Sequence, residues 1–262
     1  MPQSVEFVRD NLRVIICPDR VALGKTAATA SAKRLRASLK EEEHLNLVFA
    51  SAPSQDETLE ALLQEPGIDW ERIRAFHMDE YINHPADAPQ AFGQYLRTRF
   101  LSKLPLEAVH YIDGNAADVY QECDRYARML QEYPTDIVFV GIGENGHLAF
   151  NDPWIADFDD PQLVKVNEQL DGVCRQQQIN DGHFPDLAAV PRRAITLTIP
   201  ALFRARTAFI LVPGKSKNEI IRRTLEGPIG PGCPATIMRR HLDATLYIDR
   251  DSASLLDWEA LG

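Results

Sequence analysis

The chain alternates short apolar runs with longer segments in which apolar residues recur every three or four positions. The β-branched apolar runs predict strands, and the longer segments predict helices between them. The predicted strands are Arg13 to Cys17, Asn46 to Ser51, Ile73 to His77, Val109 to Ile112, Asp136 to Val140, Ala194 to Ile199, Thr207 to Val212 and Thr245 to Ile248. The predicted helices are Leu23 to Glu43, Glu57 to Gln64, Ala91 to Lys103, Ala116 to Glu132 and Ser216 to Glu226. This alternation predicts an α/β fold with a mainly parallel sheet, helices on both faces, and ligands at the carboxyl ends of the strands.

One long interval, Pro153 to Pro191, shows no clear period. Because it lies inside the alternation, we expect it to cover a site rather than to link two domains. No repeat or low-complexity tract interrupts the chain, and 45% hydrophobic residues suffice for a sizeable core. We therefore expect residues 1–262 to form a single domain.

The charge balance limits the classes of partner. With 28 Lys and Arg against 38 Asp and Glu, the formal net charge is -10. This charge disfavours nonspecific binding to nucleic acid or to anionic membranes, so an anionic substrate must be held by local donors.

The amino terminus and the cysteines indicate the compartment. Glu6, Arg9 and Asp10 interrupt the first residues, so neither a signal peptide nor a membrane span is expected, and we predict a cytoplasmic protein. The four cysteines are Cys17, Cys123, Cys174 and Cys233. They lie far apart without a C-x-x-C pair, which predicts reduced thiols and argues against a structural zinc site.

The loop from Gly141 to Pro153 gathers glycines, one histidine and carboxyl and amide groups directly after a predicted strand. Its first glycines allow a tight turn and place His147 at the carboxyl edge of the sheet. Gly141, Gly143 and Gly146 also match the G-x-G-x-x-G outline of a dinucleotide site. We disfavour that interpretation, because Asn, Asp and Pro soon break any following helix and the next segment is polar and irregular.

Two adjacent carboxyl groups, Asp79 and Glu80, follow the predicted strand Ile73 to His77. They point to chemistry at the carboxyl edge, although either could instead cap a helix. Glu80 and His84 have the i, i+4 spacing of metal ligands, but no third ligand is evident, so we expect no metal.

Two further clusters suit an anion. Ser51 and Ser54 occupy a strand–turn–helix junction, where hydroxyl and backbone N–H groups either bind phosphate or act as ordinary caps. Lys217 falls in the first turn of a predicted helix, against the preference of the helix dipole. It therefore indicates a nearby anion or is a solvated surface lysine.

Four segments, in order, resemble the glucosamine-6-phosphate deaminase (glucosamine-6-phosphate isomerase) family, whose relatives include 6-phosphogluconolactonases. The segments are FHMDEYI at Phe76 to Ile82, GIGENGHLAFNDP at Gly141 to Pro153, RAITLTIPAL at Arg193 to Leu202 and FILVPGKSK at Phe209 to Lys217. The resemblance covers most of the chain. The ending Phe150 to Pro153 is similar to the deaminase branch rather than to the lactonase branch.

The resemblance implies a doubly wound, Rossmann-like fold and an enzyme of amino-sugar metabolism, a hydrolase or isomerase in N-acetylglucosamine catabolism. Its implied reaction opens the hexose ring of glucosamine 6-phosphate, moves a proton between carbons 2 and 1, and releases ammonia to give fructose 6-phosphate, without a cofactor. Asp79 is the implied base. His147, oriented by Asp152, is the implied acid–base at the ring oxygen.

Further residues carry expected roles in substrate binding. The resemblance places Glu80, Gly143 and Gly146 against the substrate. The turn at Ser51 and Ser54 keeps hydroxyls but lacks the glycines of the family's phosphate turn, and Pro53 has no N–H to donate. The phosphate pocket is therefore altered, or the substrate differs.

Two other positions depart from the family pattern. Asn145 stands where the family often has an aspartate; it cannot take a proton, which leaves Asp152, or secondly Glu144, to tune His147. We keep Asn145 among the candidate catalytic residues. Arg175 is the nearest counterpart of the arginine that the family uses against phosphate.

Three functions compete. The first is a deaminating isomerase of glucosamine 6-phosphate or a close epimer, and the second is a 6-phosphogluconolactonase or another sugar-phosphate isomerase. The third is a non-catalytic sugar-phosphate-binding protein, which the joint presence of Asp79 and His147 disfavours. The expected partner is a small sugar phosphate, with no nucleic acid and no membrane, and the chain is compatible with a homo-oligomer.

Overall fold

The computed structural model describes residues 4–257 and contains a large sheet of eight strands in the order β1-β2-β11-β10-β7-β3-β4-β6. The strands are β1 (Val5–Arg9), β2 (Leu12–Cys17), β3 (Leu45–Phe49), β4 (Ile73–His77), β6 (Ala108–His110), β7 (Ile137–Val140), β10 (Thr207–Val212) and β11 (Ala244–Asp249). All neighbours pair in parallel except β1, which forms an antiparallel hairpin with β2. The expected mainly parallel sheet is confirmed, and the sequence analysis missed only its edge strand β1.

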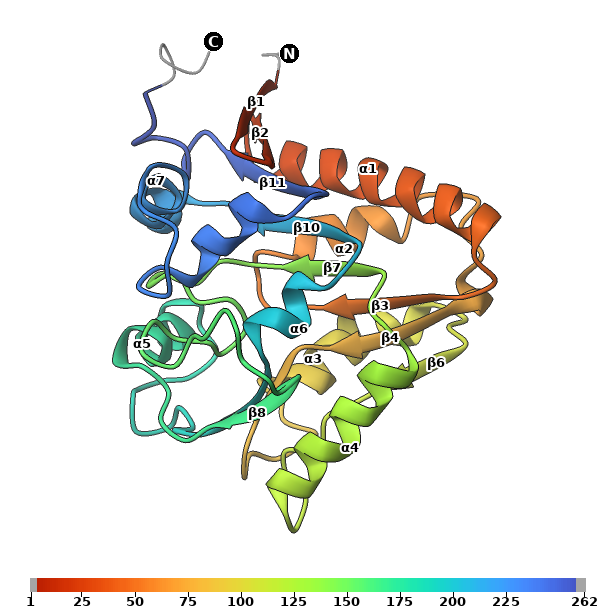
Figure 1. The fold of residues 1–262 in the computed structure, drawn as a ribbon, viewed down its shortest axis with the longest axis vertical. Helices are drawn as coiled ribbons and strands as arrows, with labels where there is room; N and C mark the ends of the chain where they lie inside the picture. Colours follow the sequence, from red (N-terminus) through yellow and green to blue (C-terminus); the bar gives the residue numbers. More distant parts are fainter. Residues whose placement is uncertain (1–3, 258–262) are drawn as a thin grey trace.

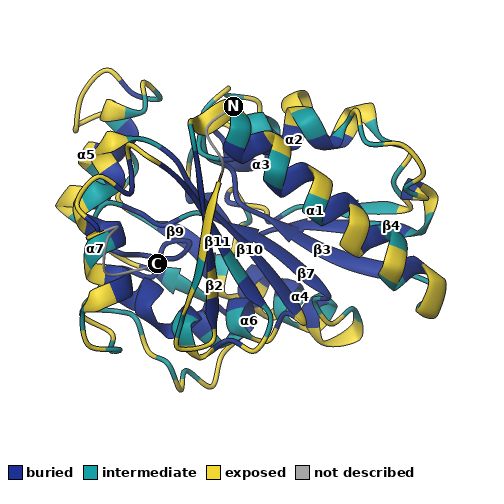
Figure 2. Cartoon of the chain, turned by 90° about the horizontal axis from the view of Figure 1, so that it is seen from above, coloured by how far each residue is buried: buried dark blue, intermediate teal, exposed yellow. Residues whose placement is uncertain are grey.

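Helices cover both faces of this sheet. They are α1 (Arg20–Glu41), α2 (Asp56–Leu62), α3 (Phe92–Arg99), α4 (Val119–Glu132), α5 (Gly172–Asn180), α6 (Ile199–Phe203) and α7 (Asn218–Glu226). Short 3-10 turns lie at Trp70–Arg72, Leu101–Lys103, Lys215–Lys217 and Pro234–Arg240. Figure 2 shows α1, α2 and α3 on one side of the buried strands and α4 and α6 on the other.

Alternation along the strands builds a separate core on each face. In β3, Leu47 and Phe49 pack beneath α1, α2 and α3, whereas Val48 packs on the opposite side with Tyr126 and Leu130 of α4. A strand buried on both faces must be apolar at every position. This requirement explains why the parallel strands read as continuous apolar runs rather than as alternating patterns.

A second, smaller sheet corrects one prediction. The run Ala194 to Ile199 was expected among the strands of the mainly parallel sheet, but β9 (Ala194–Leu197) pairs antiparallel with β5 (Asp79–Tyr81) and β8 (Val164–Asn167). The chain leaves the large sheet at Met78, whose carbonyl accepts a hydrogen bond from Leu197 N–H. An apolar run reveals that a strand is buried, but not which sheet it joins.

The interval Pro153 to Pro191 is more ordered than its sequence suggested. It contains β8 and the helix α5, elements of four and nine residues that are too short to display a period. In Figure 1, α5 lies on the side toward which the arrows of β3, β4 and β7 point. The interval is therefore close to the carboxyl edge of the sheet, although its role as a cover stays a prediction.

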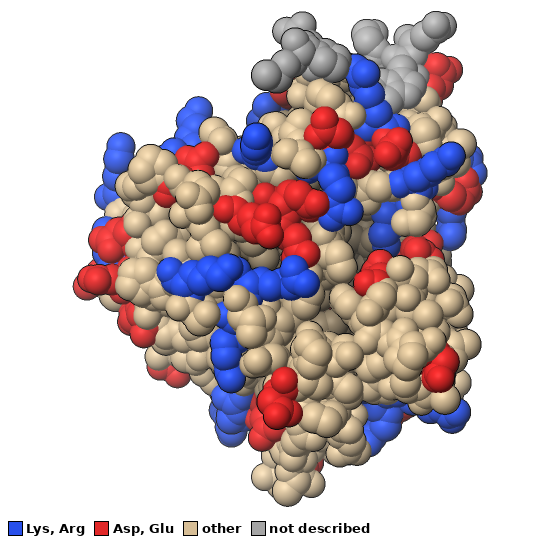
Figure 3. Space-filling model, turned by 180° about the vertical axis from the view of Figure 1, so that it is seen from behind, with Lys and Arg blue, Asp and Glu red and all other residues tan. Residues whose placement is uncertain are grey.

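Surface and thiol properties agree with the composition. All four cysteines are buried and unpaired. Within residues 4–257 no helix is long and apolar enough to span a bilayer. The face shown in Figure 3 mixes acidic and basic side chains rather than presenting a field of one sign.

Candidate active site

A cleft of about 180 Å³ opens at the carboxyl edge of the large sheet. Its walls come from the turn after β3, the junction of β4 and β5, the loop after β7, α5, and the segment 213–217 after β10. Parallel strands bring their carboxyl ends to one edge, so segments far apart in sequence meet there. The cleft contains Asp79, His147, Gly143, Ser51, Ser54 and Lys217 from the predicted set.

Asp79 is the first residue of β5, where the backbone pairs with Thr196 and the side chain lines the cleft. The side chain is only 7% exposed and makes no hydrogen bond within residues 4–257. Burial, and secondly the charge of Glu80, raise the pKa of Asp79 well above its ordinary value. A carboxylate with a raised pKa and no partner is a stronger base than one that is paired.

Glu80 has a different environment from its neighbour. Its carboxylate accepts hydrogen bonds from the backbone N–H groups of Tyr81 (2.9 Å), Phe92 (3.1 Å) and Gly93 (2.8 Å). Two of these donors open α3, so Glu80 caps that helix. Its side chain is absent from the cleft lining, and its expected contact with the substrate stays a prediction.

His147 lies flat against Gly143. A Cβ built on Gly143 would lie 2.0 to 2.3 Å from the imidazole ring, so only glycine fits there. The ring Nδ1 is 2.7 Å from Asn145 Oδ1, and Nε2 has no hydrogen-bond partner in the described part of the chain. Burial, and secondly the nearby charge of Lys217, lower the pKa of His147 to about 3. The imidazole is therefore neutral at pH 7.

Asn145, rather than a carboxylate, contacts the histidine. Asn145 Nδ2 donates to Asp152 Oδ1 at 3.0 Å and to Asp171 Oδ2 at 2.6 Å. Asp152 Oδ1 lies 3.7 Å from His147 Nδ1, which is beyond hydrogen-bond distance. The amide of Asn145 lies between Asp152 and His147, and the expected role of Asp152 in orienting His147 stays a prediction. No hydrogen bond of the described residues connects Glu144 to His147.

Gly146 supports the loop from behind. Its φ of +92° and the 2.8 Å that would separate an added Cβ from Cys233 Sγ both require glycine. Its carbonyl accepts from Ala235 N–H, and the residue does not line the cleft. The structure gives it a backbone role in the loop, and its expected contact with the substrate stays a prediction.

Lys217 provides the positive end of the cleft. It precedes α7 and is 8% exposed, and its Nζ has no hydrogen-bond partner among the described residues. Burial lowers the pKa of this lysine, while the carboxylate of Asp181 opposes that effect. Leaving a buried cation unpaired costs free energy, so its position indicates an anionic ligand.

The serines of the turn lie on the same cleft. Ser51 Oγ donates to the Phe92 carbonyl, whereas Ser54 Oγ accepts from Gln55 Nε2 and keeps its own hydrogen free to donate. The first turn of α2 carries Asp56 and Glu57, whose charges disfavour an anion at that helix start. Ser54 is accordingly the better phosphate donor of the two.

Arg175 does not face the cleft. Its guanidinium donates to the carbonyls of Leu187 and Val190 and fixes the chain that follows α5. The expected contact of this arginine with phosphate stays a prediction. The cleft instead presents Gln177, Gln178 and Asp181 from this region.

Sequence reasoning missed Arg20 and these three residues, of which Gln177 and Gln178 lie in α5 and Asp181 follows it. Arg20 begins α1 just after β2, at a carboxyl edge that the strand pattern could have flagged. It is paired with Glu57 and donates to the Pro53 carbonyl. Glutamines on a short helix give no comparable signal, because polar residues there are ordinary.

One group of side chains resembles a metal site. His147, Asp152 and Cys174 have potential ligand atoms within 4.8 Å of one another. However, His147 Nδ1 and both oxygens of Asp152 already have hydrogen-bond partners in the protein. These groups fit a hydrogen-bond network better than a metal, and the absence of a metal cofactor stays a prediction.

Comparisons with known proteins agree with this geometry. The family described as glucosamine-6-phosphate isomerases/6-phosphogluconolactonase matches residues 18–247. Glucosamine-6-phosphate deaminase 1 of Bacillus subtilis is 32% identical over 250 residues, covering 93% of this chain and 99% of that protein. A glucosamine-6-phosphate deaminase of Halothermothrix orenii is 31% identical over 249 residues, covering 94% and 100%.

Solved structures show the same fold. A monomeric glucosamine-6-phosphate deaminase superposes with a TM-score of 0.83 at 30% identity, over 92% of this chain and 99% of that one. A 6-phosphogluconolactonase of Thermotoga maritima reaches a TM-score of 0.74 at 19% identity, over 90% and 98%, which supports the fold alone. Together with the matched length, these findings show that the chain belongs to the family of glucosamine-6-phosphate isomerases and 6-phosphogluconolactonases.

Proposed function

We propose that this protein converts glucosamine 6-phosphate, or a close epimer, and water to fructose 6-phosphate, or the corresponding ketose phosphate, and ammonia. The observation that carries the proposal is the cleft itself, where an unpaired carboxylate, a neutral imidazole and an unpaired buried ammonium face one space. The relatives that match most of the chain at about 30% identity are named as deaminases, which favours this reaction over lactone hydrolysis.

His147 serves the opening of the ring. Its neutral ring leaves Nε2 able to accept the proton of the anomeric hydroxyl while the bond from carbon 1 to the ring oxygen breaks. The same proton then passes to the ring oxygen. The step needs no redox partner, because it only redistributes one proton and one bonding pair.

Asp79 serves the isomerisation. It removes the proton from carbon 2 of the open-chain sugar and returns it to carbon 1. One proton of the amine passes to the oxygen on carbon 1, so the aldehyde becomes a hydroxyl and an imine remains at carbon 2. Water then hydrolyses the imine to the ketose and ammonia. The raised pKa of Asp79 strengthens it as a base for this weakly acidic carbon. Overall the reaction is an isomerisation with hydrolytic loss of the amine, which fits amino-sugar catabolism in the cytoplasm.

Lys217 and Ser54 hold the phosphate in this proposal. The ammonium supplies charge, and the free hydroxyl hydrogen of Ser54 supplies a directed donor. Asp181 lies on the same cleft and weakens the positive potential there, so phosphate binding rests on few groups.

One assay tests the proposal. Ammonia and ketose phosphate are measured with glucosamine 6-phosphate, galactosamine 6-phosphate, free glucosamine and 6-phosphogluconolactone, without added cofactor. We expect ammonia from a phosphorylated amino sugar, and much less from free glucosamine. Hydrolysis of the lactone, with no ammonia released from either amino-sugar phosphate, would instead establish the lactonase alternative.

A further inference from the structure

Asp171 links the helix α5 to the network behind His147. It precedes α5, and its Oδ1 accepts from Val173 N–H at 3.0 Å, which caps the helix. Its Oδ2 accepts from Asn145 Nδ2 at 2.6 Å, and its own N–H donates to Asp152 Oδ2 at 3.0 Å. The two side-chain oxygens and the backbone N–H of Asp171 therefore each make a hydrogen bond to a different residue.

The two carboxylates and the backbone N–H of His147, which donates to Asn145 Oδ1 at 3.1 Å, fix which way the amide of Asn145 points. Ionised carboxylates only accept hydrogen bonds, so the atom that faces both Asp152 and Asp171 must be the NH2 group. The amide oxygen is then directed at His147 Nδ1, 2.7 Å away. Two bare acceptors at that distance would repel, so Nδ1 carries the hydrogen and Nε2 is left bare.

From this geometry we propose that Asp171 is a positioning residue, which acts through Asn145 to hold His147 in the Nδ1–H form with Nε2 free in the cleft. The inference deepens the proposed function and rests on it for the effect on turnover. Which ring nitrogen of His147 carries the hydrogen does not depend on any substrate.

A carboxylate is required at position 171 because two acceptor atoms are used at once. Serine or asparagine has one side-chain oxygen, which cannot occupy both of the positions where Oδ1 accepts from Val173 N–H and Oδ2 accepts from Asn145. Without Asp171 the second hydrogen of the Asn145 amide loses its acceptor. The amide is then held less firmly, by Asp152 and by the backbone N–H of His147 alone.

The helix that Asp171 caps also forms a wall of the cleft. Gln177 of α5 lines the cleft, and its Oε1 accepts from Glu144 N–H at 2.9 Å, which ties the helix to the glycine loop at a second point. A displacement of α5 therefore reaches His147 through Asp171. Asp171 and Gln177 therefore both connect this helix to the loop that carries His147.

The test uses Asp171→Ser, because serine caps a helix about as well as aspartate. We expect its kcat to fall about 10- to 100-fold, part of the roughly 100- to 10,000-fold contribution of an acid–base group, with KM within about threefold. Nitrogen-15 NMR of the His147 ring should change from one Nδ1–H form to a mixture of forms. Asp118→Ser, at the cap of the distant helix α4, is the matched control and should leave kcat and the ring signals unchanged.

The outcomes are distinct. A wild-type kcat with wild-type ring signals in Asp171→Ser would overturn the inference, and so would a fall in kcat with unchanged ring signals, because Asp171 would then act through α5 alone. If the wild-type protein releases no ammonia from any amino-sugar phosphate, the proposed function fails while the ring signals still decide the role of Asp171. Asp171→Asn offers a second variant should the serine protein not fold.

Discussion

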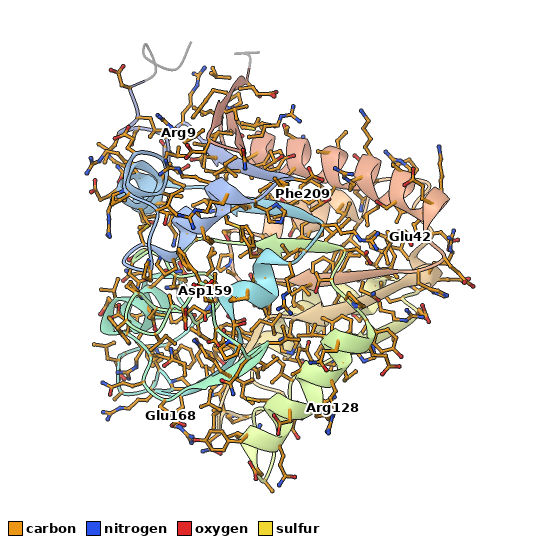
Figure 4. The ribbon with its side chains drawn as sticks, in the orientation of Figure 1. Arg9, Glu42, Arg128, Asp159, Glu168 and Phe209 are labelled. Carbon is orange, nitrogen blue, oxygen red and sulfur yellow. The ribbon has the colours of Figure 1, made fainter. Side chains whose placement is uncertain are left out.

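The two edges of the large sheet differ in whether their charged side chains have partners. At the amino edge, Arg206 pairs with Glu42 and Asp136, and Arg72 donates to three backbone carbonyls. Figure 4 labels Glu42 at this edge, on the far side of the molecule from α5 and α7. At the carboxyl edge, Asp79 and Lys217 are buried without such partners.

The difference follows from function rather than from packing alone. An unpaired buried charge destabilises the fold, so a sequence selected only for stability would pair it or remove it. Charges kept unpaired at one edge are available to a ligand, whereas the paired charges at the other edge are already used. Substitutions at the two edges should therefore have opposite consequences for activity and stability.

The largest expected effect is that of Asp79→Asn. We expect kcat to fall about 100- to 10,000-fold, because the amide keeps the shape but cannot accept the proton. Because the folded-state pKa of Asp79 is raised, this carboxyl destabilises the fold at neutral pH, and that cost disappears below the ordinary value of 3.8. The variant should therefore be more stable than the wild type at pH 7, with the difference vanishing near pH 3, as measured by urea unfolding.

Glu80→Gln is the control for that change. Its amide cannot satisfy all three backbone donors that the carboxylate now accepts. We expect a loss of about 1 to 3 kcal/mol in the free energy of unfolding and a smaller loss of kcat than at Asp79. Equal losses of kcat at both positions would contradict the assignment of the base.

An intermediate effect is expected from Lys217→Met. If the ammonium binds phosphate, KM should rise about 10- to 100-fold with little change in kcat, since a group remote from the reacting carbons contributes uniform binding. The rise should shrink as salt increases. The folded-state pKa of Lys217 is lowered, so the wild type should gain stability relative to the variant as pH rises toward 10.5. An unchanged preference for phosphorylated over free sugar would place the phosphate elsewhere.

The smallest effect is expected at the amino edge, from Arg206→Ala. The Arg206 side chain is 65% exposed, and exposed ion pairs contribute about 0 to 1 kcal/mol. We expect the free energy of unfolding to fall by no more than that and the kinetic constants to stay at their wild-type values. A substantial loss of kcat would show that charged side chains at the amino edge do contribute to activity.

The sequence by itself determined the architecture and the centre of the site. Apolar runs separated by helical segments predict a parallel α/β sheet, because strands buried on both faces need apolar side chains throughout. The rule that parallel strands present their carboxyl ends at one edge then placed Asp79, His147, Ser54 and Lys217 together. Each of these residues lies within a few positions of the carboxyl end of a strand of the large sheet, so local sequence was sufficient.

Only the tertiary structure decided what lies behind and beside those residues. Asn145 meets Asp171 across 26 positions, and Arg175 turns to the carbonyls that follow α5 instead of to the cleft. Both outcomes depend on how the second sheet and α5 pack against the glycine loop. A hydrogen bond between distant segments depends on distances set by the whole fold, and neither the spacing nor the periodicity of a sequence records them.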